Sequence, residues 1–211
     1  IDVSTYEAEL RKMLDDEQYA AVVAPHQNVL VRANAGSGKT RVLTARVAYL
    51  IAQGIPSEQI MLLTFTKKAS REMLERVEGL LNKKEIHVFG GTFHSVAVKI
   101  LRQYARYIGY HRPFAILDST DSVGLVAEIR LSYIKRHQLD KTDVPVARII
   151  HGIGSKAINC AISLRDVASE YAISNHEFRY VTEILDEYVE RKKLNFMMDF
   201  DDLLVNLAKV L

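Results

Sequence analysis

The chain has 211 residues, of which 48% are hydrophobic and 26% are charged, with a formal net charge of +2. These ordinary values suit one or two globular domains with a real core and exclude a fibrous or compositionally disordered chain. The single cysteine, Cys160, excludes an internal disulfide framework, and no apolar run approaches the roughly 20 residues of a membrane helix. The start, at Ile1, lacks a signal-peptide pattern, so we expect a cytoplasmic protein that makes no membrane contact.

Short apolar runs alternate with helical patterns in the first part of the chain. Residues 28–33, 60–65 and 86–90 are typical of strands, whereas 38–53 and 67–81 carry apolar residues at helical spacing. This alternation predicts an α/β fold with a parallel sheet and right-handed crossovers.

After residue 92 the pattern becomes mainly helical. Segments 96–107, 121–135 and 177–194 predict helices, and 114–117 is a strand candidate. Pro145 and the glycines of "HGIGSK" (151–156) are expected to break the middle of this region.

The segment "FMMDFDDLL" (196–204) places apolar residues before carboxylates, as a Walker B strand does. Its helical spacing predicts instead a helix start, with Asp199 as the N-cap and Asp202 in the first turn, where a carboxylate favours the helix dipole.

The stretch "ANAGSGKT" follows the first predicted strand and opens the first long predicted helix of the alternation. Glycines let the backbone wrap an anion, so this spacing predicts a phosphate-binding P-loop; the alternative is a glycine-rich connector with an incidental lysine. Lys39 would reach the β/γ-phosphates and the Thr40 hydroxyl would bind Mg²⁺, which makes these two the predicted catalytic residues. The predicted loop comprises Ala33, Asn34, Ala35, Gly36, Ser37, Gly38, Lys39 and Thr40.

Three other motifs surround the P-loop: "LDDEQYAAV" precedes it, "TFTKKAS" (64–70) ends the second predicted strand, and "GTFHS" (91–95) ends the third. Ligands bind at the carboxyl ends of strands in open α/β sheets, so all three strand ends would face one side. Together the motifs resemble superfamily 1A DNA helicases of the UvrD/Rep/PcrA family, which carry them in this order.

The resemblance implies a P-loop, RecA-like fold with an incomplete sheet and a mainly helical inserted subdomain. Residues 1–92 and 199–211 would form the ATP-binding subdomain 1A, truncated before Walker B, and 93–198 the helical subdomain 1B. ATP and Mg²⁺ are the implied cofactors. Gln18 would recognise the adenine edge and Arg41 the adenine face; without the resemblance, Gln18 is equally an exposed polar residue at a helix start.

The resemblance also implies a sequence-blind site for single-stranded DNA, in which Phe65 stacks on a base. The alternatives from the residues alone are that Phe65 belongs to the core and that His94 bonds a backbone carbonyl. Lys67 and Ser70 depart from the family, which commonly has Asn and Ala there. The predicted DNA-binding residues are Thr64, Phe65, Thr66, Lys68, Thr92, His94, Ser95, Lys99 and Arg102.

No Asp or Glu occurs between Ile86 and Leu117, where basic residues alternate with aromatic ones. Lys99, Arg102 and Arg106 share one helix face, which suits a phosphate backbone and equally suits a solvated surface.

The implied function is an ATP-dependent DNA helicase of repair or replication that moves 3′ to 5′ and binds single strands and single-strand/duplex junctions. Walker B carboxylates and the arginines of a second RecA-like domain are absent from these residues, so we expect the N-terminal part of a longer helicase that does not hydrolyse ATP alone. The alternatives are a P-loop phosphotransferase with a helical lid and a DNA-binding module that nucleotide gates without hydrolysis.

Overall fold

The computed structural model describes residues 3–25, 28–84 and 86–211. The chain forms two compact units, Ile1–Val96 and Ala97–Leu211, and is mainly helical with small parallel sheets. Within the described ranges, every helix is too short or too polar to cross a bilayer.

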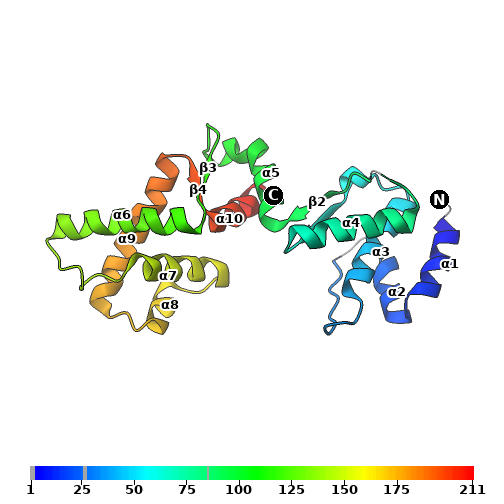
Figure 1. Ribbon diagram of the computed structural model, residues 1–211, viewed down its shortest axis with the longest axis horizontal. Helices are drawn as coiled ribbons and strands as arrows, with labels where there is room; N and C mark the ends of the chain where they lie inside the picture. The colour runs from blue at the N-terminus through cyan, green and yellow to red at the C-terminus, as the bar shows by residue number, and fades with distance from the viewer. Residues whose placement is uncertain (1–2, 26–27, 85) are drawn as a thin grey trace. The chain divides into compact units, whose positions relative to one another are not determined.

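The first unit combines helices with one pair of parallel strands, against which helix α4 (Lys67–Leu81) packs. Its elements are α1 (Val3–Met13), α2 (Asp16–Val23), α3 (Lys39–Ala52), the 3₁₀ turn η1 (Ser57–Gln59), β1 (Met61–Thr64), α4 (Lys67–Leu81) and β2 (Phe89–Thr92). The strand pair is in register from Met61 opposite Phe89 to Thr64 opposite Thr92. Helices α3 and α4 pack against each other, as Figure 1 shows, with α1 and α2 against α3.

Helix α4 illustrates how the sequence specifies this unit. Thr66 caps its start by accepting a hydrogen bond from the Ala69 N–H at 3.1 Å. Met73, Val77 and Leu81 recur at helical spacing and are buried in the core of the unit. The predicted helices at 38–53 and 67–81 and the strand at 60–65 are therefore confirmed, and β2 begins near the end of the third predicted strand.

The predicted strand at 28–33 is wrong for this structure. The segment is in no sheet, and Leu30 is 84% exposed. A strand needs a neighbour for its backbone N–H and C=O groups, and in the described residues β1 and β2 pair only with each other. The predicted phosphate loop therefore follows a segment that lies outside the two-stranded sheet.

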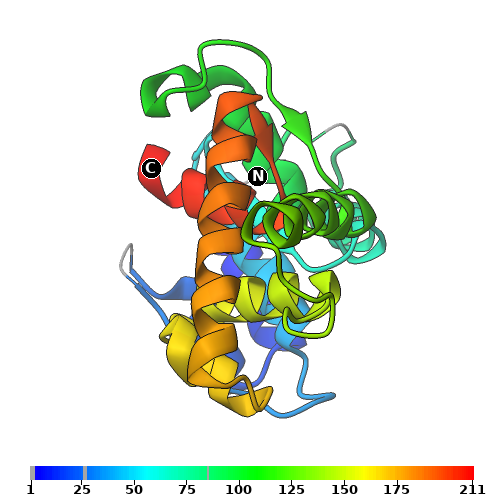
Figure 2. The same ribbon diagram turned by 90° about the vertical axis from the view of Figure 1, so that its left-hand side faces the viewer.

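The second unit is a helical bundle with a short strand pair. Helix α5 (Phe93–Tyr104) runs across the division between the units, and the elements after it are η2 (Ala105–Ile108), β3 (Ala115–Ile116), α6 (Ser119–His137), α7 (Ala147–Cys160), α8 (Leu164–Glu170), α9 (Asn175–Leu194), β4 (Met197–Met198) and α10 (Phe200–Val210). Helix α9 packs against α6 and α7, and β3 pairs with β4 in parallel (Figure 2). The helices predicted at 96–107, 121–135 and 177–194 and the strand at 114–117 are confirmed in position.

The expected glycine break at 151–156 is wrong, because Gly152 and Gly154 lie inside α7. Gly154 is there for contact: a Cβ at this position would lie 2.9 Å from Leu185 Cδ2 of α9. Glycine therefore lets the two helices approach without displacing the Leu185 side chain, a role that the sequence pattern alone cannot distinguish from a turn.

Helix α10 begins where the sequence predicts. Asp199 is the N-cap and forms a capping box with Asp202. Helix α10 packs within the second unit, against η2 and α7. The assignment of 199–211 to the ATP-binding subdomain is not seen in this packing and stays a prediction.

Gly154→Ala should destabilise the second unit by about 1 kcal/mol, because the Leu185 side chain has to shift to make room for the added methyl group. Gly152→Ala is the matched control, since its Cβ would lie 3.8 Å from the nearest atom, the Tyr171 hydroxyl oxygen. The control should be neutral or slightly stabilising because alanine favours helix. Chemical denaturation of both variants measures the difference, and equal midpoints would contradict this account of Gly154.

Candidate functional site

The predicted phosphate loop forms the connection into α3. Gly36 and Gly38 both have positive φ, +79° and +84°, a conformation that glycine adopts without strain. Gly38 is the N-cap of α3, so the first N–H groups of the helix open onto the loop. A Cβ at Gly36 would meet no atom within 4 Å, which leaves the loop open on that side.

The Lys39 side chain folds back onto the backbone of the predicted phosphate loop. Its Nζ donates hydrogen bonds to the carbonyl oxygens of Ala33, at 3.0 Å, and Asn34. These carbonyls hold an exposed ammonium group at the mouth of the loop, where a phosphate would compete for it. Ser37 supports the turn, because its hydroxyl donates a hydrogen bond to the backbone carbonyl oxygen of Asn34 at 2.7 Å.

Gln18 lies against this loop. Its Nε2 donates to the Ser37 carbonyl oxygen at 3.0 Å, and a Cβ on Gly38 would approach that nitrogen to 3.0 Å. The Gln18 side-chain oxygen accepts from the Asp15 N–H in the capping box of α2, at 3.4 Å. A cleft of about 470 Å³ is lined by Gln18, Ala33, Asn34, Ser37 and Lys39 among others. The predicted glutamine and the phosphate loop therefore share one cleft.

Arg41 is not brought to this cleft. It lines a separate hollow with Met13, Thr44 and Arg76, between α3 and α4. The predicted packing of Arg41 on an adenine face would require its side chain to leave this hollow, and it stays a prediction.

At the ends of β1 and β2, two aromatic rings lie side by side. Phe65 is 91% exposed, so the interpretation that it belongs to the core is wrong. Its ring centroid is 5.5 Å from that of Phe93, which is 38% exposed, at an interplanar angle of 41°. Phe93 is not among the residues predicted from the sequence to bind DNA, although the "GTFHS" motif lies at the end of its strand just as "TFTKKAS" lies at the end of the neighbouring one.

The hydroxyl groups beside these rings form hydrogen bonds with nearby backbone groups. Thr64 is buried and donates to the Thr66 carbonyl oxygen at 2.9 Å. The Thr92 hydroxyl oxygen accepts a hydrogen bond from the Ser95 N–H at 3.2 Å. The Ser95 hydroxyl in turn donates to the Thr92 carbonyl oxygen at 2.9 Å. Together these bonds fix the ends of the strands and the starts of α4 and α5.

The charged residues predicted for DNA have different surroundings. Lys68 is exposed and forms a loose ion pair with Glu72 at 3.8 Å, and His94 is exposed. Arg102, in the second unit, donates to the Phe114 carbonyl oxygen at 2.8 Å, with its guanidinium 4.3 Å from the Phe114 ring centre. This side chain already holds the loop before β3, while Lys99 is exposed on the same helix.

A glycine loop before a helix and a strand–helix–strand unit beside it are features of phosphate-binding α/β proteins. Comparison of the sequence defines the class more closely. Residues 14–211 match the UvrD/REP helicase N-terminal domain, and the chain belongs to this family.

Curated relatives agree with this assignment. The ATP-dependent DNA helicase PcrA of Bacillus subtilis is 36% identical over 198 residues, 93% of this chain and 26% of that protein. The ATP-dependent DNA helicase UvrD1 of Mycobacterium tuberculosis is 37% identical over 203 residues, 94% of this chain and 25% of that protein. DNA helicase II of Haemophilus influenzae is 36% identical over 208 residues, 96% and 28% respectively. The chain thus spans about a quarter of the length of these relatives.

Proposed function

We propose that this chain is the nucleotide-binding and single-strand-binding part of an ATP-dependent DNA helicase with a P-loop, RecA-like fold. The observation that carries the proposal is the exposed pair Phe65 and Phe93 on the same unit as the phosphate loop. Membership in the UvrD/REP family and the names of the relatives support the helicase function over the phosphotransferase alternative. Movement 3′ to 5′ and junction binding stay predictions from the resemblance.

ATP would bind in the cleft that Gln18 shares with the phosphate loop. The loop N–H groups and the start of α3 suit the phosphates, and Lys39 would exchange loop carbonyls for phosphate oxygens. The donor set also fits Mg²⁺, because this ion keeps several waters and is commonly bound through substrate phosphates plus few protein oxygens. Thr40 would supply such an oxygen, and the described residues contain no cluster of three acidic, His or Cys side chains that would hold a metal by itself.

Single-stranded DNA would bind at the aromatic pair. Two exposed rings offer a stacking surface for unpaired bases without reading their sequence. Lys68 and His94 are exposed, and each lies a few residues after one of the two strands. Their side chains would contact phosphates of the DNA backbone. Lys99 and Arg102, in the second unit, stay predicted DNA contacts, and Arg102 would have to give up its bond to Phe114.

Phe65→Ala should weaken binding of a fluorescent oligothymidine by about 5- to 150-fold, the effect of losing about 1–3 kcal/mol of base stacking. Because Phe65 is exposed, the melting temperature should not change. Phe93→Ala should weaken binding in the same direction. Tyr171→Ala removes a partly exposed aromatic residue of the second unit and is the control. Equal affinity of the wild type and the Phe65→Ala variant, measured by anisotropy at fixed salt, would reject the stacking site.

Lys39→Ala should weaken binding of a fluorescent ATP analogue by about 10- to 150-fold, since a charge-assisted hydrogen bond contributes about 1.5–3 kcal/mol. Lys83→Ala, at an exposed lysine after α4, is the matched control and should bind normally. With DNA present, the wild-type chain should release phosphate no faster than the Lys39→Ala variant. Turnover of about one per second or faster would show that the chain contains the catalytic carboxylates after all.

A further inference from the structure

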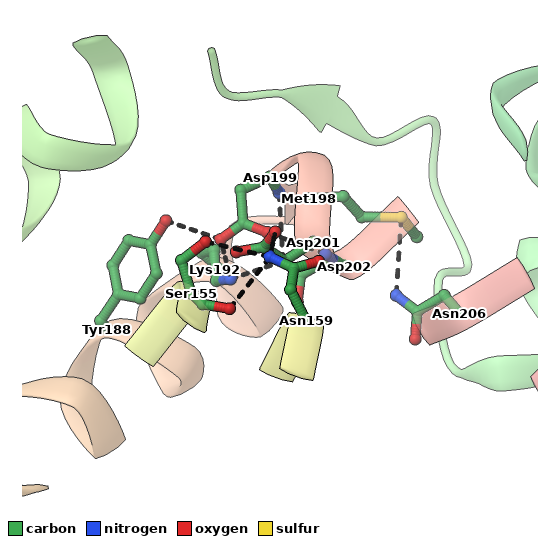
Figure 3. A network of polar contacts seen from close by, with 9 residues as sticks. All are labelled: Ser155, Asn159, Tyr188, Lys192, Met198, Asp199, Asp201, Asp202 and Asn206. Atoms are coloured by element: carbon green, nitrogen blue, oxygen red, sulfur yellow. Dashed lines mark hydrogen bonds and ion pairs between the residues drawn. The ribbon is translucent and has the colours of Figure 1, made fainter. Parts of the chain in front are cut away.

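A buried ion cluster lies where α9 meets the start of α10 (Figure 3). The Lys192 side chain is 4% exposed and that of Asp199 is 6% exposed, and the two form an ion pair. Lys192 Nζ also lies 2.6 Å from Asp202 Oδ2. The Tyr188 hydroxyl donates to Asp199 Oδ2 at 2.8 Å. Two residues one turn apart on α9 therefore hold both carboxylates of the α10 capping box.

Helix α7 holds the same turn of α10 from another direction. Asn159 Nδ2 donates to Asp201 Oδ1 at 2.8 Å (Figure 3). The same amide nitrogen is 2.9 Å from the Ser155 carbonyl oxygen and 3.2 Å from its hydroxyl oxygen, which fixes the amide on α7. The first turn of α10 is thus bonded to two helices.

The charges of this cluster do not balance, because one ammonium faces two carboxylates. Burial, with the charge of Asp199, raises the pKa of Asp202 against the attraction of Lys192. Burial also opposes ionisation of Asp199, but the charge and hydrogen bond of Lys192 outweigh it and lower the pKa of Asp199. A buried ion cluster of this kind adds little net stability compared with apolar residues of similar volume, yet losing one partner is costly. Its distinctive effect is that only one arrangement of the helices satisfies every group.

We propose that Lys192 is a positioning residue, which locks the first turn of α10 onto α9 so that α7, α9 and α10 move as one rigid body. This inference does not depend on nucleotide or DNA binding, so its failure leaves the proposed function untouched.

Hydrogen exchange of the complete chain tests this role with two variants. Lys192→Met leaves the buried carboxylate of Asp199 and the partly buried one of Asp202 without their cation, so it should lower both the melting temperature and the protection of the α10 amides. Adding Asp199→Asn and Asp202→Asn removes the stranded charges, while Asn still caps the helix. This triple variant should regain most of the melting temperature, yet its α10 amides should stay about tenfold less protected than in the wild type, while those of α6 keep their protection.

Lys193→Met is the matched control, because Lys193 is the neighbouring lysine of α9 and its side chain is 62% exposed. It should leave the exchange of α10 unchanged. Two results would overturn the proposal: wild-type protection of α10 in the Lys192→Met variant, or wild-type protection of α10 in the triple variant. The second result would mean that the cluster contributes to folding alone and does not position the helix.

Discussion

The pairing of β1 with β2 is the constraint on which the candidate DNA site depends. Parallel strands end at the same edge of a sheet. The register places Thr64 opposite Thr92, so the residues that follow these two threonines are also neighbours. Those residues are Phe65 and Phe93. Helix α4 starts two residues after Phe65, and helix α5 starts at Phe93. Both rings are exposed, and this exposure is the reason that we propose a ligand for them.

The predicted phosphate loop is held by other interactions than strand pairing. Its shape depends on two glycines with positive φ, on the capping of α3 by Gly38, and on hydrogen bonds from Lys39, Ser37 and Gln18 to loop carbonyls. Lys39 is thus held by neutral carbonyls that a phosphate group would replace. The loop keeps this form although the segment before it pairs with no strand in the described residues, because the bonds of Lys39 and Ser37 are local and Gln18 adds one from α2.

Local signals predicted most of the helices and the Asp199 cap of α10. The apolar spacing of α4 and the Asp199 cap of α10 can be derived from the sequence because they involve residues within a few turns of each other. Features that depend on distant partners were missed or misjudged. The segment 28–33 pairs with no strand in the described residues, so it forms no strand itself. The place of Gly154 inside α7 is explained by its contact with Leu185, and the burial of Lys192 is explained by its ion pair with Asp199. The exposure of Phe65 was likewise open until its surroundings were known.

The most direct test of the account is to map both ligands on the same protein by NMR. Oligothymidine added to the isotope-labelled chain should shift the amide signals of Phe65, Phe93 and their neighbours, and an ATP analogue should shift those of Gly36, Gly38 and Lys39. Signals of the first unit that stay fixed at saturating concentrations of both ligands, with shifts confined to the second unit, would contradict the central claim that one unit binds nucleotide and strand.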